Sequence, residues 1–161
     1  MLADALLQCV RARSMIRAQS RSVGTGSGYQ AAVLARLARK VCTVEIVAPL
    51  GEAAAAALKA LGHDNVDARI GDGYRGSPEC GPFDAIVVTA AIGHVPHPLI
   101  DQLRLGGCIV MPLGRASATQ ELSVAEKIAP DRTTTRAVST VAPIIGEITK
   151  STIIRFFETG R

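Results

Sequence analysis

Three glycines with one residue between each, Gly24, Gly26 and Gly28, stand early in the chain and are its strongest candidate for a binding loop. Glycine is favoured where a chain turns tightly from a strand into a helix and a ligand must come close to the backbone. The dinucleotide-binding fingerprint G-x-G-x-x-G would require a further glycine at position 29, which is Tyr29 here. The spacing therefore indicates a ligand-binding turn of a different type, with a glycine-rich turn that binds nothing as the alternative.

Two acidic residues follow at positions from which they could reach the same ligand. Glu45 lies 21 residues after Gly24, at the end of the next expected strand, where a carboxylate can accept both hydroxyls of a ribose. Asp72 lies within a Gly-Asp-Gly sequence after a third expected strand, and its carboxylate could accept an adenine amino group. A solvated glutamate and a simple turn are the alternatives. Because open α/β sheets bind ligands at the carboxyl ends of their strands, the three elements together favour binding.

Strand-like and helix-like patterns alternate up to residue 120 and place these residues on loops of an α/β domain. Apolar positions at helical spacing and glycine stops predict helices over residues 29–40, 49–61 and 98–104. Short runs rich in β-branched residues predict strands over residues 41–47, 66–70, 83–89 and 108–112. Three further strands are predicted without helices between them, over residues 121–128, 133–144 and 151–157. We therefore expect a doubly wound, mostly parallel sheet with an antiparallel C-terminal part.

The sequence around the glycines resembles the cofactor loop of the protein-L-isoaspartate O-methyltransferase family, including the Tyr29-Gln30 pair after the last glycine. The G-x-G-x-G spacing is the methyltransferase form of such a loop. The most distinctive matches are Gly71-Asp-Gly-Tyr-Arg-Gly76 and Pro82-Phe-Asp-Ala-Ile-Val-Val-Thr-Ala-Ala91. The family's other motifs follow in the same order, as Val44-Glu-Ile-Val47, Leu105-Gly-Gly107, Pro112-Leu-Gly114, Gln120-Glu-Leu122 and Val141-Ala-Pro143. The resemblance covers about residues 23–145.

This resemblance implies a Rossmann-like class I domain that binds S-adenosylmethionine and releases S-adenosylhomocysteine. It implies cofactor contacts from the glycine loop and from the strand ends that follow it, namely Gly24, Thr25, Gly26, Ser27, Gly28, Glu45, Ile46, Asp72, Gly73 and Thr89. It also implies substrate contacts from Thr89, Ala90, Val141 and Pro143.

The reaction implied by the resemblance is methyl transfer to the free carboxylate of L-isoaspartyl residues in damaged proteins or peptides, which begins their repair. A carboxylate with a reference pKa near ~4 is already ionised at neutral pH and needs no general base to attack a sulfonium methyl group. Alignment and proximity can then supply roughly 7–11 kcal/mol of the reduction in the barrier. We therefore expect no catalytic triad and name no catalytic residue.

The N-terminal segment departs from the family's pattern. Where the family has an apolar first strand that ends in an acidic residue, this chain has Ser22, and the strand would have to lie within residues 15–23. Arg17, Gln19 and Arg21 contradict a continuously apolar central strand, because burying an unpaired arginine costs several kcal/mol. We therefore separate a divergent basic segment, residues 1–21, from a single methyltransferase domain, residues 22–161. Four interpretations of this segment remain open: a surface helix or frayed terminus, a rearranged start, a targeting segment, and an unusual first strand.

Three other functions compete with an active isoaspartyl methyltransferase. A non-catalytic remnant that keeps part of the nucleotide pocket would explain Ser22 and the altered first strand. A methyltransferase with another substrate would follow if the first 21 residues form a different roof over the pocket. A nicotinamide-dependent oxidoreductase is disfavoured by Tyr29, which stands where the third fingerprint glycine would be.

Composition argues against several further classes. The 161 residues suffice for one domain and carry a net charge of +4, of which +3 lies in the first 21 residues, so we expect no nucleic-acid partner. No apolar run approaches the roughly 20 residues of a membrane span, so we expect no membrane partner. Four cysteines without a CxxC pattern predict reduced thiols in a cytoplasmic protein, which we expect to be a monomer. His94 and His97 flank Pro96 and lack a third nearby ligand, so we expect no metal site.

Overall fold

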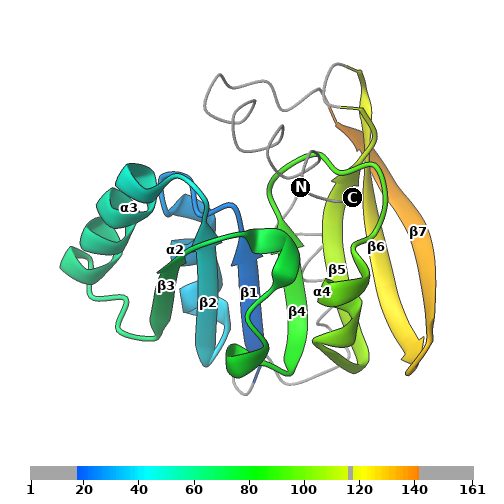
Figure 1. Cartoon of the computed structure of the whole chain (residues 1–161), viewed down its shortest axis with the longest axis horizontal. Helices are drawn as coiled ribbons and strands as arrows, with labels where there is room; N and C mark the ends of the chain where they lie inside the picture. The colour runs from blue at the N-terminus through cyan, green and yellow to red at the C-terminus, as the bar shows by residue number, and fades with distance from the viewer. Residues whose placement is uncertain (1–17, 116–117, 142–161) are drawn as a thin grey trace.

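The computed structural model describes residues 18–115 and 118–141, which form one seven-stranded sheet with helices packed against it (Figure 1). The strands are β1 (Gln19–Val23), β2 (Lys40–Glu45), β3 (Val66–Ile70), β4 (Phe83–Val88), β5 (Leu103–Leu113), β6 (Gln120–Ala129) and β7 (Arg132–Val141). The helices are α2 (Tyr29–Leu37), α3 (Ala48–Ala60), α4 (His97–Asp101) and two short 3-10 helices, η2 (Gly73–Arg75) and η3 (Pro78–Cys80). Within these described ranges, no helix combines the length and the apolar character needed to cross a membrane.

The strand order is β3-β2-β1-β4-β5-β6-β7, and the order reverses at β1. The first five strands are parallel to one another, whereas β6 and β7 are antiparallel additions. This arrangement confirms the predicted doubly wound, mostly parallel sheet with an antiparallel C-terminal part. Sheets of this kind bind ligands at the carboxyl ends of the strands beside the reversal point, which here are β1 and β4. The strand predicted over 151–157 and the last residues of that over 133–144 lie outside the described residues.

The largest difference from the predicted elements lies between α4 and β5. The sequence predicts a helix to residue 104, whereas α4 ends at Asp101 and β5 already begins at Leu103. Phe83 N donates to the carbonyl of Gln102 at 2.8 Å, which draws the chain into the sheet directly after the helix. A register shift between Phe83 and Ala85 then accommodates the additional residues of the longer strand.

Apolar side chains cover both faces of the parallel strands, as their unbroken apolar runs predict. On the face covered by α4, Ile86 and Val88 pack in one core cluster with Leu99. On the opposite face, Val87 packs in a second cluster with Leu34 of α2. The two clusters hold the central strands from both sides and thereby position the loops at the strand ends.

β1 forms despite its polar sequence, and all five of its residues are buried. It pairs in parallel with β2 on one side and with β4 on the other. Residues 19–23 therefore adopt the unusual first strand, against the expectation that Gln19 and Arg21 exclude one. Polar partners help, since Gln19 N donates to Asp84 Oδ2 at 2.8 Å and the Gln19 amide donates to the carbonyl of Cys80. β1 spans the proposed boundary between residues 21 and 22, and residues 1–17 lie outside the described part, so that division stays a prediction.

Arg21 is fully buried in the middle of β1, with no ion-pair partner among the described residues. Its Nη1 donates to Gln102 Oε1 at 3.2 Å, and its guanidinium lies 5.7 Å from the centroid of the Phe83 ring. Nε and Nη2 have no hydrogen-bond partner. Burial lowers the pKa of Arg21 to about 10, against the opposing effect of Glu79. Arg21 is therefore a destabilising charge at the centre of the sheet.

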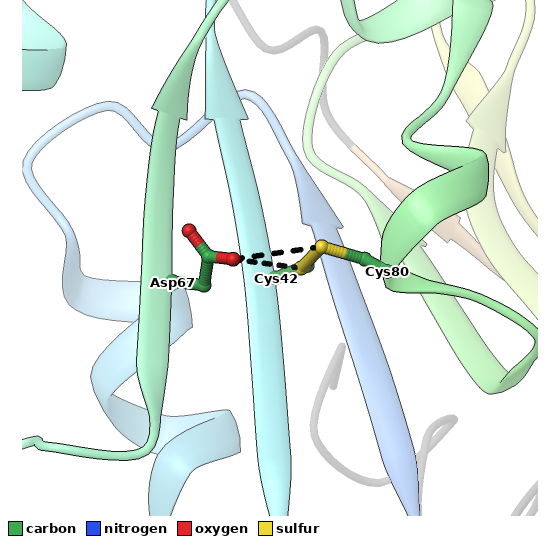
Figure 2. A group of neighbouring side chains, drawn as sticks. All are labelled: Cys42, Asp67 and Cys80. Carbon is green, nitrogen blue, oxygen red and sulfur yellow. Dashed lines mark hydrogen bonds between the residues drawn. A yellow bond between two sulfur atoms is a disulfide. The ribbon is translucent and has the colours of Figure 1, made fainter.

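A disulfide joins Cys42 of β2 to Cys80 of η3, so the prediction of reduced thiols is wrong for this pair (Figure 2). Their Cα atoms are 6.6 Å apart, within the range that disulfides span. The two residues are 38 positions apart in the sequence and meet because the segment before β4 folds back over the sheet. None of the cysteines that the structure describes is a free thiol.

Candidate functional site

The loop between β1 and α2 carries the three glycines at the carboxyl end of β1 (Figure 1). All three have positive φ, at 86° for Gly24, 55° for Gly26 and 86° for Gly28. A Cβ on Gly24 would lie 2.6 Å from Oγ1 of Thr89, and one on Gly28 would lie 3.3 Å from Leu58. The loop therefore needs glycine for its backbone shape at all three positions and for close packing at two of them.

β2 holds this loop through backbone and side-chain hydrogen bonds. The N–H groups of Gly24 and Thr25 both donate to the carbonyl of Val44, at 3.0 and 3.2 Å. The buried hydroxyls of Thr25 and Thr43 are 2.7 Å apart and share a hydrogen bond. Sequence reasoning missed Thr43, because a threonine within an apolar strand gives no sign of a partner on the next loop. The protein's own contacts therefore fix the loop to β2.

Glu45 ends β2 with a carboxylate that faces the glycine loop and is only 2% exposed. Its Oε2 accepts a hydrogen bond from Gly26 N at 2.9 Å, and its Oε1 accepts one from Val47 N at 3.1 Å. Gly51 of α3 packs against it so closely that a Cβ there would lie 3.2 Å from Cβ of Glu45. Each carboxylate oxygen can accept a second hydrogen bond, so Glu45 retains capacity for two further donors.

Asp72 follows β3 and caps η2, with Oδ1 accepting a hydrogen bond from Tyr74 N at 2.9 Å. The Gly-Asp-Gly sequence therefore forms a turn that the Asp72 side chain stabilises. Gly71 N donates to the carbonyl of Glu45 at 2.9 Å, which ties this turn to the end of β2. The structure thus brings both acidic residues to one edge of the sheet, as their positions after successive strands predict.

Thr89 supports the glycine loop from the side of β4. Its N–H lies 3.0 Å from the carbonyl of Val23, and its hydroxyl donates toward the carbonyls of Val23 and Gly24 at 2.9 and 2.8 Å. Ala90 beside it is buried in the core. Val141 ends β7, three strands from β4 in the sheet, which places it about 14 Å away across the strands. Val141 is therefore not beside the other predicted substrate residues, and Pro143 lies outside the described residues.

The remaining predicted cofactor residues differ in their exposure. Ser27 is exposed in the glycine loop, Ile46 is half-buried after β2, and Gly73 is buried in η2. Ser22, where the resemblance expects an acidic residue, is fully buried in β1, and its Oγ has no hydrogen-bond partner. The end of β1 therefore supplies no acidic side chain to this edge of the sheet.

A family model described as Protein-L-isoaspartate(D-aspartate) O-methyltransferase matches residues 4–146 of the chain. A protein-L-isoaspartate O-methyltransferase 1 of Nitrosospira multiformis is 57% identical over 116 residues, which cover 72% of this chain and 49% of that protein. A protein-L-isoaspartate O-methyltransferase 2 of a Polaromonas species is 53% identical over 127 residues, which cover 78% of this chain and 60% of that protein. The chain thus spans about half to three fifths of the length of these relatives.

Solved structures resemble the chain over a similar extent. A protein-L-isoaspartate O-methyltransferase has a TM-score of 0.77 at 28% identity and covers 89% of this chain and 47% of its own. A putative enzyme of the same name from Plasmodium falciparum, solved with S-adenosyl-L-homocysteine, has a TM-score of 0.70 at 23% identity over 89% of this chain and 70% of its own, which shows a common fold. With a family model that matches most of its length and relatives above 50% identity, the chain belongs to the protein-L-isoaspartate O-methyltransferase family.

Proposed function

We propose that the chain binds S-adenosylmethionine at the carboxyl edge of the sheet and transfers its methyl group to the free carboxylate of L-isoaspartyl residues. The observation that carries this proposal is the placement of the glycine loop, Glu45 and Asp72 at one edge, in a chain of this family. Activity, substrate and cofactor are all proposed, because the chain spans only 49% and 60% of the two relatives' lengths.

The residues at this edge fit the adenosine part of the cofactor. Glu45 keeps acceptor capacity on both carboxylate oxygens, which matches the two neighbouring hydroxyls of a ribose. Gly26 carries no Cβ, and a Cβ there would meet nothing within 4 Å, so a ligand can come close to the loop backbone at this position. Asp72 offers a carboxylate for an amino group, and the neighbouring Ile70, which is 50% exposed, offers an apolar surface for a purine ring.

S-adenosylmethionine, when bound, supplies an activated methyl group on a sulfonium ion. The chain then has to orient the reactants rather than activate them, because an isoaspartyl carboxylate with a pKa near ~4 is ionised at neutral pH. Thr89 contributes as a positioning residue, since its hydroxyl donates to the carbonyls that begin the glycine loop. Ala90, Val141 and Pro143, with Thr89, are the proposed substrate contacts.

One observation favours a second candidate, a pocket that binds the cofactor without transferring its methyl group. Ser22 leaves a buried hydroxyl without a partner at the end of β1, where the resemblance expects an acidic residue. An incomplete pocket of this kind could retain the adenosine contacts from β2 and β3 and still misplace the methyl group. Binding without turnover would identify this candidate.

We further propose that the protein acts in the cytoplasm as a monomer, on protein substrates rather than on nucleic acid or membranes. Its charge distribution supports this, because the residues after position 21 carry a net charge of only +1 and offer a polyanion little to bind. Light scattering after size-exclusion chromatography measures the molar mass and so tests whether the protein is a monomer. Fractionation of cells that express the protein tests the compartment.

Replacing Glu45 with glutamine is expected to weaken the binding of S-adenosylhomocysteine by about 10- to 150-fold, which corresponds to roughly 1.5–3 kcal/mol for hydrogen bonds to a charged group. Glutamine keeps the size of the side chain but has a single acceptor oxygen, so it cannot accept the hydrogen bonds from Gly26 N and Val47 N on two separate oxygens. Isothermal titration calorimetry on the full chain measures the affinity.

Glu126→Gln is the matched control, because Glu126 is an exposed glutamate of β6 that pairs with Cys108 toward the opposite end of the sheet. An equal loss of affinity in the two variants would contradict the assignment of Glu45.

Methyl transfer is tested in a separate experiment. The chain is incubated with methyl-labelled cofactor and an isoaspartyl peptide, and the same peptide with normal aspartate is the control. Labelling of the isoaspartyl peptide alone supports the proposed enzyme, whereas binding without labelling leaves the second candidate.

A further inference from the structure

A second cluster of ligand-type side chains lies on the sheet, apart from the edge that carries Glu45 (Figure 2). The sulfurs of Cys42 and Cys80 and a carboxylate oxygen of Asp67 lie within 4.8 Å of one another. Asp67 Oδ2 is 3.9 Å from the Cys42 sulfur and 3.6 Å from the Cys80 sulfur. The three residues come from β2, η3 and β3, and Asp67 is 25 and 13 positions from the two cysteines, so no sequence motif marks them.

We propose that the reduced Cys42 and Cys80 thiolates and the Asp67 carboxylate form a binding site for a thiophilic divalent cation, of which zinc is the first candidate. Thiolate ligands select zinc and related soft cations, and carboxylates also serve as zinc ligands. In reducing compartments, cysteines that meet in this way serve metal binding or catalysis more often than structural disulfides. Three protein ligands leave the fourth coordination position to water.

The distances around the carboxylate match such a site. Zinc holds a thiolate sulfur at about 2.3 Å and a carboxylate oxygen at about 2.0–2.2 Å, which sets sulfur and oxygen about 3.5 Å apart in a tetrahedron. The separations of 3.6 and 3.9 Å are close to that length. The two sulfurs would lie about 3.8 Å apart in the same geometry, which cleavage of the disulfide allows. Asp67 therefore lies within reach of both sulfurs, and forming the site requires the cysteine side chains to turn and Arg69 Nη2 to release Oδ2.

The surrounding charges also favour two thiolates. Two thiolates, one carboxylate and one divalent cation leave a net negative charge, which needs a positive neighbour inside a protein. Arg21 is the register partner of Cys42 on the adjacent strand, and it is buried with two unpaired guanidinium nitrogens. On the other side, Arg69 forms an ion pair with Asp67, with Nη2 2.9 Å from Oδ2 and Nε 3.3 Å from each carboxylate oxygen. Binding of a cation by Oδ2 therefore requires Nη2 to release that oxygen, while Nε can keep its contact with Oδ1.

The exposed part of the cluster is Asp67. The side chain of Asp67 is 35% exposed, whereas the two cysteines are each 2% exposed. Asp67 also lines a surface pocket, together with Arg39, Lys40, Asp64, Asn65 and Val66. Solvent therefore has access to the Asp67 side chain, although the sulfurs themselves are covered.

Binding of the cation requires two chemical steps. A thiol reductant first cleaves the disulfide, so that each cysteine sulfur gains one electron and one proton while two reductant thiols become a disulfide. Zinc then displaces the two thiol protons, and two Zn–S bonds and one Zn–O bond form. The metal site and the Cys42–Cys80 disulfide are therefore mutually exclusive states of the same pair.

Cobalt(II) titration of the full chain, reduced with a phosphine under argon, tests the site, because tetrahedral thiolate-bound cobalt has a characteristic absorption spectrum. We expect a single cobalt per chain, displaced by zinc, and no binding to the disulfide form. Cys42→Ser and Cys80→Ser should each lose this binding. Asp67→Asn should weaken it by at least about tenfold, because the amide is a poorer ligand than the carboxylate.

Cys108→Ser is the matched control, since Cys108 packs in the core cluster on the other face of the sheet and should leave cobalt binding unchanged. Zinc should also raise the melting temperature of the reduced parent chain, a readout that does not depend on how stable the variants are. Absence of the cobalt spectrum in the reduced parent overturns the proposal. Its survival in both cysteine variants, or re-formation of the disulfide in the presence of zinc, overturns it as well and leaves a redox-active pair instead.

Discussion

Replacing Gly24 with alanine is expected to lower the stability of the domain by about 2–4 kcal/mol and to abolish binding of S-adenosylhomocysteine. The φ of 86° at this position costs a residue with a Cβ roughly 1–2 kcal/mol. The new Cβ would lie 2.6 Å from Thr89 Oγ1 and displace the hydroxyl that donates to the carbonyls of Val23 and Gly24, at a further cost of about 1 kcal/mol per hydrogen bond. Thermal melts and calorimetry on the same samples measure the two effects.

Gly62→Ala separates the backbone strain from the overlap with Thr89. Gly62 has a φ of 74° directly after α3, and a Cβ there would meet nothing within 4 Å. Backbone strain alone should therefore destabilise the Gly62→Ala variant, and its affinity for S-adenosylhomocysteine should be unchanged. The double variant Gly24→Ala/Thr89→Ala should be no less stable than Gly24→Ala, because the displaced hydroxyl is already lost. Equal melting temperatures for Gly24→Ala and Gly62→Ala would show that the overlap with Thr89 does not affect the stability of the domain.

Replacing Arg21 with methionine is expected to stabilise the disulfide form of the protein by about 1–4 kcal/mol, because it removes a buried charge with two unpaired nitrogens. Burial lowers the pKa of Arg21 to about 10, which shows that the fold disfavours the charged form. The substitution loses one hydrogen bond to Gln102 and the contact with the Phe83 ring, each worth about 1 kcal/mol. Gln102 Oε1 keeps its bond from Ser77 N at 2.8 Å, so no new polar atom is orphaned there.

Denaturant unfolding at neutral pH, without reductant, measures this gain. Arg36→Met is the matched control, because Arg36 is exposed on α2 and its replacement should change stability by no more than about 0.5 kcal/mol. Folded and unfolded chains both keep Arg21 protonated below pH of about 10, so the gain should be constant through the neutral range and shrink only above that pH. Destabilisation of the Arg21→Met variant would contradict the interpretation of Arg21 as a cost to the fold.

The alternation of apolar runs and helical patterns is enough to predict most of the sheet, because β2 and β4 are buried on both faces and carry continuous apolar residues. β1 cannot be predicted in this way, since it contains Gln19 and Arg21 and owes its place to pairing with β2 and β4. The start of β5 also depends on a partner, because Leu103 joins the strand by pairing with Phe83. Local composition therefore predicts strands whose own residues are apolar. It does not predict strands that form because they pair with neighbouring strands.

The two acidic residues of the candidate site follow from the sequence because each directly follows or ends a strand, and the carboxyl ends of parallel strands share one edge. The metal-ligand cluster does not follow from it. Cys42 and Asp67 meet because they are register partners on β2 and β3, and a slip of one residue would turn Asp67 to the other face. Cys80 joins them only through the path of the segment before β4, which no local pattern specifies.

The central place of β1 determines when the protein can fold during its synthesis. β1 is the first described strand to leave the ribosome, yet Ser20 pairs with Ala85, which is made 65 residues later. Non-local pairing of this kind slows folding, because a long loop has to close before its contacts contribute. Until β4 emerges, one edge of β1 stays open and Arg21 stays hydrated. A nascent chain that stalls in this interval presents an unpaired central strand, which is a substrate for chaperones and a template for pairing with another chain.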